Sequence, residues 1–423
     1  MRQYRIKGGR TKLSGEVKIG GAKNAVLPIL AAMCLNERES VIHNCPRIAD
    51  TFVSLEILES MGYKTEFVEN TLIVSPPDRL NCNIPDECVS KMRSSILFAG
   101  AMLAQCGEID IALPGGCELG NRAIDIHISG LRAMGAEICQ KGKRLHCTVD
   151  GLKGARIPLH FASVGATENI MIAAVKARGE TIIENAAREP EIIDLAHFLI
   201  ELGAKIKGAG TRVIRIIGVD KLRQLKPHTI RPDRIVAGTY LTAAAMTRGD
   251  VTVTDVNPID LLPIVSRLSD MGCHIRIRDN CVRLTAPERL SALPELVTKI
   301  HPGFPTDMQA QFVAALTIAN DKSIVTETIF NKRHQHSHEL NRMGANISMS
   351  PCNRKFTISG VETLKSAVVS AKDLRGGAAL VLAGLAAEGE TIVQNAEYVE
   401  RGYECIEKDL SKLGADIILE DAG

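Results

Sequence analysis

Residues 196–206 read AHFLIELGAKI, a pattern that recurs five more times along the chain. In each copy an apolar helical run ends in Leu or Met, a glycine follows, and a strand-like segment comes next. Glycine adopts the left-handed conformation that commonly ends a helix, so we predict a helix C-terminus at Gly203 and at its five counterparts. The other copies are LEILESMGYK (55–64), ISGLRAMGAEI (128–138), VSRLSDMGCHI (265–275), HELNRMGANI (338–347) and IEKDLSKLGADI (406–417).

A second, Ala-rich apolar run precedes each of these copies. These runs are apolar nearly all round, which is typical of a buried helix. Together with the strand-like segments they predict an α/β chain of six similar units of about 70 residues, each containing a helix, a strand, a second helix and further strands. The Ala-rich runs are NAVLPILAAMCL (24–35), SSILFAGAMLA (94–104), ENIMIAAVKA (168–177), RIVAGTYLTAAAM (234–246), MQAQFVAALTIA (308–319) and LRGGAALVLAGLAA (374–387).

The length of 423 residues favours two domains. Six units are too many for one hydrophobic core, so we assign three units to each domain. Two prolines in KPHTIRPDR (226–234) interrupt the pattern between the third and fourth units, and we place the boundary there. The N-terminal strand RQYRIKG (2–8) could pair with either half.

Composition excludes several classes of function. Hydrophobic residues make up 45% and charged residues 24%, the balance of a soluble globular protein. A net charge of +2 provides no broad field for nucleic acid or an anionic membrane, and 3% aromatics without Trp disfavour a single-strand binder. We find no signal peptide or membrane-spanning run and expect a cytoplasmic protein. Twelve dispersed cysteines without a CxxC pair predict neither a disulfide framework nor structural zinc.

Charged or amide residues stand at the start of every Ala-rich run. Asp, Asn and Thr there suit helix capping. Lys23, Arg93 and Arg375 do not, because cations oppose the positive end of the helix dipole. Such cations suit a bound anion, so we expect a phosphorylated substrate; the alternative is salt bridges on the surface or in the core. The residues at these starts are Lys23-Asn24, Met92-Arg93, Thr167-Glu168-Asn169, Asp233-Arg234, Thr306-Asp307 and Asp373-Leu374-Arg375.

A cysteine follows two glycines in LPGGCELGNRAIDIH (113–127). A buried structural cysteine needs no such glycines, whereas a reactive one benefits from a supple turn that carries it toward a ligand. Arg122 follows in the same loop, so we expect a depressed pKa of the Cys117 thiol. The alternative is an incidental surface thiol.

Seven motifs in order along the chain resemble the UDP-N-acetylglucosamine enolpyruvyl transferase family. The resemblance implies a two-domain inside-out α/β barrel with three units per domain, residues 22–231 forming one domain and residues 1–21 plus 232–423 the other, with the active site in the cleft between them. It further implies transfer of the enolpyruvyl group of phosphoenolpyruvate to the 3′-hydroxyl of UDP-N-acetylglucosamine, the first committed step of peptidoglycan synthesis, without a metal or organic cofactor. The motifs are GGAKNAVLPIL, LPGGCELGNR, SVGATENIM, ENAAREPEI, HPGFPTDMQAQF, DLRGGAAL and RGYE.

The resemblance also implies roles for single residues. Cys117 matches the proton donor, which can form a covalent adduct and is alkylated by the epoxide fosfomycin. Asp307 matches the base or orienting group at the sugar hydroxyl, with a helix N-cap as its alternative. Lys23 and Arg401 complete the predicted catalytic set. The residues implied to bind phosphoenolpyruvate are Lys23, Asn24, Arg122, Arg375 and Arg401, with Asp373 beside them.

The nucleotide-sugar is expected along several short segments. His127 could steady a loop or a phosphate, or could equally be a buried structural histidine. The implied contacts are Asn24, Arg93, Arg122, Ala123, Ile124, Asp125, Ile126, Phe161, Ser163, Val164, Gly165, Asp307 and Ile329. For the arginines, solvated salt bridges are the alternative.

Some positions depart from the family pattern. Ala123 replaces a usual proline, Phe161 replaces a lysine and suggests stacking on uracil, and Asn331-Lys332 replace a Glu-Asn pair. The histidines of HQHSH (334–338) could bind metal from a strand, but the resemblance places them at a helix start, where they do not converge.

Three rival functions remain beside this one. They are the sister enzyme acting on shikimate 3-phosphate, a binding paralogue without turnover, and an RNA-processing relative built from similar repeats. The cysteine loop argues against the first and the near-neutral charge against the last. We expect small-molecule substrates as partners, no nucleic acid or membrane, and a monomer rather than an oligomer.

Overall fold

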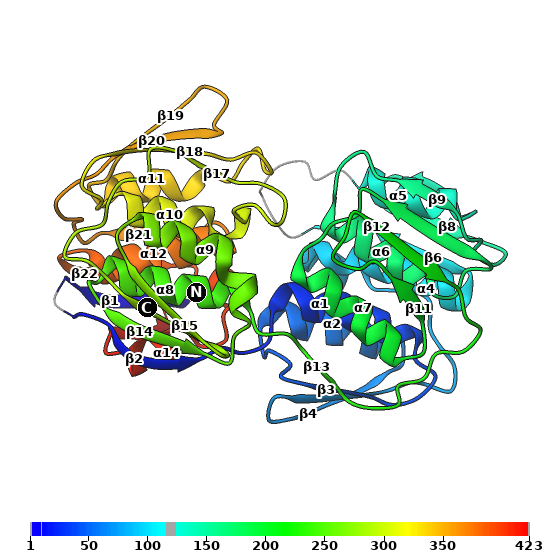
Figure 1. Cartoon of the computed structure of the whole chain (residues 1–423). Helices are drawn as coiled ribbons and strands as arrows, with labels where there is room; N and C mark the ends of the chain where they lie inside the picture. Colours follow the sequence, from blue (N-terminus) through cyan, green and yellow to red (C-terminus); the bar gives the residue numbers. More distant parts are fainter. Residues whose placement is uncertain (1, 10, 116–123, 422–423) are drawn as a thin grey trace. The chain divides into compact units, whose positions relative to one another are not determined.

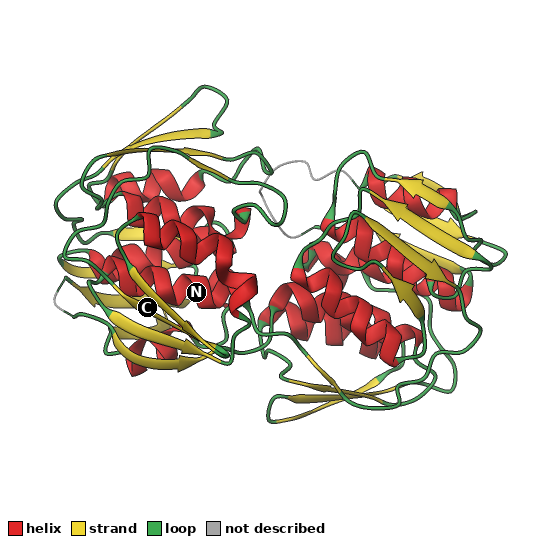
Figure 2. Ribbon diagram, viewed as in Figure 1, coloured by secondary structure: helices red, strands yellow, loops and turns green. Residues whose placement is uncertain are grey.

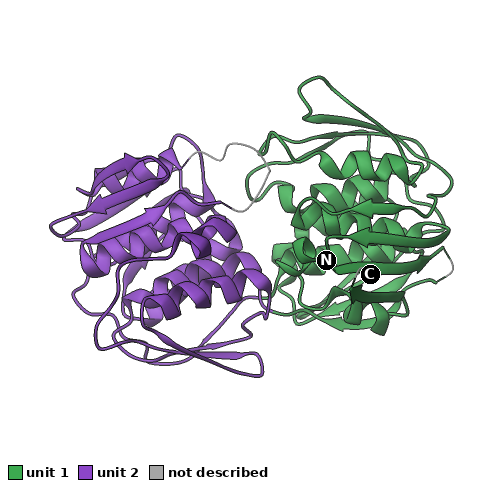
Figure 3. Ribbon diagram, turned by 180° about the vertical axis from the view of Figure 1, so that it is seen from behind, with its two compact units in different colours: residues 1–20, 118–121, 232–423 green, residues 21–117, 122–231 purple. Residues whose placement is uncertain are grey.

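The computed structural model describes residues 2–9, 11–115 and 124–421 (Figure 1). These residues form two compact units, drawn in different colours in Figure 3. One unit contains residues up to Gly20 together with those from Pro232 onward, and the other contains the described residues from Gly21 to Arg231. Within the described residues, no helix has the length and apolarity needed to cross a bilayer.

Six buried helices form the interior of the two units, three in each. Their Ala-rich sequences are buried on nearly every face, as predicted, and Figure 2 shows strands on the outside of each unit. Small side chains let these helices approach closely: a Cβ on Gly100 would lie 2.3 Å from Oδ1 of Asn169. The buried helices are α1 (Lys23–Ala32), α4 (Leu97–Cys106), α6 (Val164–Ala174), α8 (Arg234–Met246), α10 (Gln309–Leu316) and α12 (Leu374–Ala386).

A second set of helices follows, and each of them ends at a glycine of the repeated pattern. All six of these glycines have positive φ, between 86° and 108°, which confirms the predicted left-handed helix ends. These helices are α2 (Ala49–Ser60), α5 (Asp125–Ala133), α7 (Pro190–Glu201), α9 (Pro258–Asp270), α11 (Gln335–Arg342) and α14 (Ile406–Lys412). Shorter helical pieces are η1 (Met33–Leu35), α3 (Asp86–Lys91), η2 (Arg93–Ile96), η3 (Thr306–Met308) and α13 (Glu397–Glu400).

Within the described residues, each unit carries three small sheets. In five copies of the repeat, one strand follows the buried helix and pairs antiparallel with a later hairpin. The first strands are β3 (Ser40–His43), β6 (Glu108–Ala112), β10 (Glu180–Glu184), β14 (Asp250–Thr254) and β18 (Lys322–Thr326). The hairpins are β4 (Lys64–Val68) with β5 (Thr71–Ser75), β7 (Glu137–Lys141) with β8 (Arg144–Thr148), β11 (Lys205–Lys207) with β12 (Val213–Ile217), β15 (His274–Arg278) with β16 (Cys281–Thr285), and β19 (Asn346–Met349) with β20 (Lys355–Ser359).

The sixth sheet uses the N-terminal strand. Strand β1 (Arg2–Gly8) lies between β22 (Gly389–Gln394) and β23 (Asp416–Asp421) and is antiparallel to both. The repeat pattern left open which half this segment joins, whereas the family resemblance implied the C-terminal half. The pairing places β1 in the sheet of the C-terminal half. Tyr4 and Ile6 of β1 are fully buried, so the strand is part of the core of that unit.

A short parallel strand completes five of the sheets. These strands are β2 (Ser14–Lys18) beside β14, β9 (Arg156–Pro158) beside β10, β13 (His228–Thr229) beside β3, β17 (Leu296–Val297) beside β18, and β21 (Val368–Ser370) beside β22. In the sheet of β6, the corresponding place holds an isolated parallel bridge between Asn83 and Asp110. The six-unit α/β architecture predicted from the repeats is therefore confirmed.

Candidate active site

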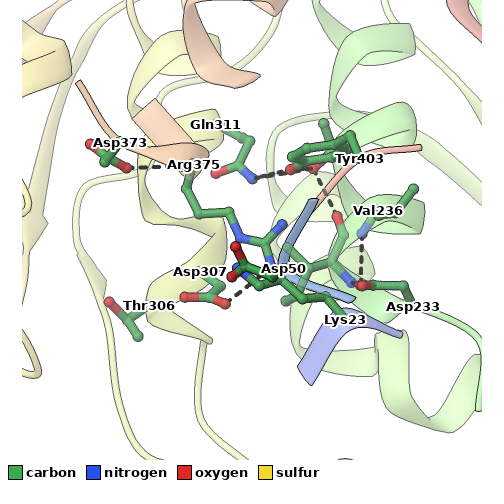
Figure 4. A network of polar contacts seen from close by, with 12 residues as sticks. Lys23, Asp50, Asp233, Val236, Thr306, Asp307, Gln311, Asp373, Arg375 and Tyr403 are labelled. Atoms are coloured by element: carbon green, nitrogen blue, oxygen red, sulfur yellow. Dashed lines mark hydrogen bonds and ion pairs between the residues drawn. The ribbon is translucent and has the colours of Figure 1, made fainter. Parts of the chain in front are cut away.

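Asp307 lies in η3, the turn that leads into the buried helix α10. Its Oδ1 accepts a hydrogen bond from Nη1 of Arg333 at 2.9 Å. Its Oδ2 accepts one from Nη2 of Arg375 at 3.2 Å (Figure 4). Both arginine side chains are at most 4% exposed. Asp307 is not the N-cap residue of either helix, because Pro305 holds that position for η3 and Met308 holds it for α10.

Arg375 lies in the first turn of α12. Asp373 is the N-cap of this helix, and its Oδ1 accepts hydrogen bonds from the backbone N–H groups of Arg375 and Gly376 at 3.1 and 2.9 Å. The capping interpretation is therefore right for Asp373. Asp233 caps α8 in the same way.

Three buried polar side chains, of Tyr403, Thr239 and Gln311, lie beside the Arg375 side chain. The guanidinium carbon of Arg375 lies 5.4 Å from the ring centre of Tyr403, and the hydroxyl of Tyr403 lies 2.9 Å from Oγ1 of Thr239. Gln311 donates to both hydroxyl groups (Figure 4). Among the described residues, Nε and Nη1 of Arg375 have no hydrogen-bond partner although they are buried. Two nitrogen atoms of a fixed cation thus remain available as donors to an anion.

Arg401 and Ile329 belong to the same unit. Arg401 is half-buried at the C-terminal end of α13, two residues before Tyr403. Ile329 is half-buried in the loop after β18, and its N–H donates to Oε1 of Glu327 at 2.8 Å.

Lys23 is the first residue of α1, in the other unit. Its Nζ lies 2.9 Å from Oδ2 of Asp50 in the first turn of α2, and the two side chains are 11% and 4% exposed. The cations expected to bind an anion at helix starts therefore include two, Lys23 and Arg375, that already have carboxylate partners. Asn24 and Arg93 are half-buried, at the starts of α1 and η2.

The α6 helix begins at the predicted nucleotide-sugar segment. Ser163 is its N-cap and accepts a hydrogen bond from the N–H of Ala166, and Val164 is its first residue. The prediction that this helix starts at Thr167-Glu168-Asn169 is wrong, because the helix begins at Val164 and these three residues are buried within it. A Cβ on Gly165 would lie 3.3 Å from the His127 ring, so this glycine permits a close approach.

His127 is buried on α5. Its Nδ1 lies 3.1 Å from Nδ2 of Asn169, which requires Nδ1 to be the acceptor and places the ring proton on Nε2. Burial, together with the positive charge of Arg93, lowers the pKa of His127 to about 4. The imidazole is therefore neutral near pH 7 and presents no positive charge to a phosphate.

The other residues predicted to contact the nucleotide-sugar lie at the start of α5 and at position 161. Ile124 is the N-cap of α5, Asp125 is its first residue, and Ile126 is buried. Oδ2 of Asp125 lies 3.8 Å from Nε2 of His160. Phe161 is 42% exposed, and its ring is accessible to a planar ligand. Cys117, Arg122 and Ala123 lie outside the described residues.

Sequence reasoning missed four residues of these clusters: Asp50, Glu327, Arg333 and Tyr403. Arg333 is adjacent to HQHSH, where only the histidines drew notice. His334 is the N-cap of α11 and His336 is buried against Phe356. Over the described residues, no group of three or more His, Cys, Asp or Glu side chains could hold a metal.

The six repeats with interior helices and the carboxylate held by buried guanidinium groups define a class of protein. The family model for EPSP synthase (3-phosphoshikimate 1-carboxyvinyltransferase) matches residues 7–410, which identifies this class as the carboxyvinyl transferases. Among solved structures, the enolpyruvyl transferase NikO from Streptomyces tendae has a TM-score of 0.89 at 23% identity, covering 100% of this chain and 99% of its own. That likeness shows the fold.

Curated relatives narrow the class. UDP-N-acetylglucosamine 1-carboxyvinyltransferase 2 of Caldanaerobacter subterraneus is 49% identical over 418 residues, which is 99% of each chain. UDP-N-acetylglucosamine 1-carboxyvinyltransferase of Finegoldia magna is 44% identical over 409 residues, which is 96% of each chain. The chain belongs to the UDP-N-acetylglucosamine 1-carboxyvinyltransferase family.

Proposed function

We propose that the chain transfers the enolpyruvyl group of phosphoenolpyruvate to the 3′-hydroxyl of UDP-N-acetylglucosamine and releases phosphate. This is the first committed step of peptidoglycan biosynthesis. The observation that carries the proposal is Asp307, an acceptor carboxylate fixed between Arg333 and Arg375 at the turn that also matches the family motif. Full-length similarity to relatives of that name supports the choice of acceptor.

The proposed reaction is an addition followed by an elimination. The 3′-oxygen attacks C2 of phosphoenolpyruvate and loses its proton, while C3 gains a proton. The C2–O bond to phosphate then breaks as C3 returns a proton. A general acid and a general base must therefore act at opposite ends of the reacting double bond. We assign the acid to Cys117 and the base, or the group that orients the hydroxyl, to Asp307.

The remaining charged residues would bind the substrates. Arg375 would offer two buried nitrogen donors, Nε and Nη1, to the carboxylate or phosphate of phosphoenolpyruvate, and Arg122 and Arg401 would add guanidinium groups. Lys23 neutralises Asp50 and would place its ammonium group, with the side chain of Asn24, at the junction of the two substrates.

The nucleotide-sugar would lie against Arg93, residues 122–126, Phe161 and the α6 start at Ser163–Gly165. Small residues at a helix start let backbone N–H groups approach a diphosphate, and an exposed ring at 161 suits stacking on uracil. Because Lys23 and Asp307 belong to different units, the proposal requires that both units serve one reaction.

The assignment of Cys117 is tested by alkylation with fosfomycin followed by peptide mass spectrometry. We expect one adduct on Cys117 and fosfomycin-sensitive phosphate release in the wild-type protein. Cys117→Ser should lose the adduct and most turnover, whereas Cys139→Ser, which changes an exposed thiol on β7, should retain both. An adduct on another cysteine, or a fully active Cys117→Ser variant, would refute the assignment.

A further inference from the structure

Glu327 is a buried carboxylate directly after β18, and it is 1% exposed. Its Oε1 accepts hydrogen bonds from Oγ1 of Thr298 at 2.9 Å and from the N–H groups of Ile329 and Phe330 at 2.8 and 3.1 Å. Its Oε2 accepts one from Oγ1 of Thr306 at 2.9 Å. One side chain thus joins three separate segments: the end of β17, the turn η3 and the loop at 328–330.

The hydroxyl of Thr306 connects Glu327 to the proposed base. Nη1 of Arg333 donates to Oγ1 of Thr306 at 2.8 Å and to Oδ1 of Asp307 at 2.9 Å. A hydroxyl has one proton, so Thr306 accepts from Arg333 and donates to Glu327. The direction of these hydrogen bonds requires an acceptor at Oε2 of Glu327. An amide N–H₂ group in place of Oε2 would leave the Thr306 proton without a partner.

The same carboxylate sets the loop that follows β18. Two consecutive backbone N–H groups, of Ile329 and Phe330, converge on Oε1, and Thr328 is bonded to Thr298 through its N–H and its hydroxyl. The backbone around Ile329 is therefore fixed against the segment that carries Asp307.

We propose that Glu327 is a positioning residue for the acceptor sugar, because it fixes the separation between Asp307 and the backbone at Ile329. The inference rests on the proposed function, in which these two groups face UDP-N-acetylglucosamine. Phosphoenolpyruvate is assigned to other groups, so the effect of Glu327 falls on acceptor binding and on the reaction of the acceptor hydroxyl.

Glu327→Gln tests the inference, with three companion variants. Gln keeps the acceptor for Ile329 and Phe330 but loses the acceptor for Thr306. Thr306→Val removes the same hydrogen bond from its other end, and Thr306→Ser restores it. Glu339→Gln is the matched control, since Glu339 is a buried carboxylate of the same unit that accepts from the N–H of Ser370 and from Arg342.

Titration calorimetry with UDP-N-acetylglucosamine and steady-state phosphate release provide the readout. For Glu327→Gln and Thr306→Val we expect Kd and KM for UDP-N-acetylglucosamine to rise about tenfold and kcat to fall about tenfold, while KM for phosphoenolpyruvate changes less than about twofold. Thr306→Ser and Glu339→Gln should resemble the wild type.

Two other outcomes would overturn the inference. Glu327→Gln could keep wild-type affinity for the nucleotide-sugar, or it could only lower the folded fraction, with normal kinetic constants for the folded protein. A wild-type protein that binds UDP-N-acetylglucosamine but releases no phosphate would contradict the proposed function alone. A wild-type protein that does not bind this ligand would contradict both.

Discussion

At the scale of single residues, the ion pair between Lys23 and Asp50 involves the lysine for which we propose a role in substrate binding. Both side chains are nearly buried, so removing one charge leaves the other unpaired in a poorly hydrated place. Breaking a buried pair from one side costs about 3 to 5 kcal/mol, while replacing both partners with apolar groups is often neutral. Replacing one partner or both partners of this pair therefore separates an effect on stability from an effect on activity.

We predict that Lys23→Met lowers the free energy of unfolding by about 3 kcal/mol and abolishes phosphate release. Lys23→Met combined with Asp50→Leu should recover most of the stability and none of the activity. Urea unfolding and a phosphate assay on the same samples measure the two effects. An active double variant would show that the Lys23 ammonium group does not take part in the reaction.

Because His127 is buried, we predict that the stability of the unit containing the described residues from Gly21 to Arg231 depends on pH. Its pKa is about 4 in the folded chain and 6.5 as the reference value, so the unfolded chain binds more protons between these limits. Stability from this residue is complete above pH 6.5 and is lost as the pH falls toward 4. The lowered pKa corresponds to about 2 kcal/mol lost between about pH 7.5 and about pH 5.

Hydrogen exchange of the α5 and α6 amides at about pH 7.5 and about pH 5, corrected for intrinsic rates, measures this loss. His127→Gln should remove about 2 kcal/mol of the difference between the two pH values. His197→Gln, at an exposed position on α7, should leave the difference unchanged. Equal pH dependence in the wild type and in His127→Gln would contradict the assignment.

At the scale of elements, each repeat turns from helix to strand at a glycine. Gly135, after α5, has a φ of 96°, and a Cβ there would meet no atom of the described residues within 4 Å. The cost of a side chain at this position is therefore backbone strain rather than a clash. Left-handed backbone costs a residue with a Cβ about 1 to 2 kcal/mol.

Gly135→Ala should lower the free energy of unfolding by about 1 kcal/mol, and Gly135→Asn by less, because Asn tolerates positive φ better. Gly20→Ala is the control, since Gly20 does not have positive φ and a Cβ added there would also meet no described atom within 4 Å. Urea denaturation of the three variants gives the comparison. A neutral Gly135→Ala would contradict the strain argument.

The repeated elements could be predicted from the sequence because their signals are local. Apolar periodicity and a glycine at the helix end act within about ten residues, and both are visible in each copy of the pattern. The start of α6 was predicted too late in the chain. The polar residues from Thr167 to Asn169 suggested a helix start, but they are buried inside the helix, and Ser163 is the residue that caps it.

The candidate site was less predictable, since its key contacts join distant segments. Arg333 approaches Asp307 from the segment before α11, and Arg375 approaches it from α12. No sequence pattern links residues this far apart in the chain, so the two contacts could not be predicted. Asp50 pairs with Lys23 through the packing of α2 on α1. The roles of single residues came from the family resemblance, and the assignment of Cys117 stays a prediction.

At the scale of the whole molecule, the chain order differs from the order in space within the C-terminal unit. Arg2 of β1 and Asp421 of β23 are register partners, so the two ends of the described chain lie beside each other. Residues 2–20 belong to the unit that otherwise begins at Pro232. Joining the termini and opening the chain between Arg231 and Pro232 would give each unit one continuous segment.

We predict that this circular permutant, with a short Gly/Ser linker, folds and retains more than about a tenth of wild-type activity, because domain boundaries tolerate new termini. Circular dichroism, thermal unfolding and the phosphate assay test it. A permutant opened inside α8, between Thr239 and Tyr240, is the control and should fail to fold, because both residues are buried. Failure of the first permutant would show that the 231–232 connection is needed for folding.

The central claim is that the chain uses UDP-N-acetylglucosamine as the acceptor of the enolpyruvyl group. The initial rate of phosphate release from phosphoenolpyruvate measures it directly when UDP-N-acetylglucosamine and shikimate 3-phosphate are compared as acceptors. We predict release with the nucleotide-sugar, a loss of about a hundredfold or more in kcat for Asp307→Asn, and no release with shikimate 3-phosphate. Release with shikimate 3-phosphate alone, or with neither acceptor, would contradict the account.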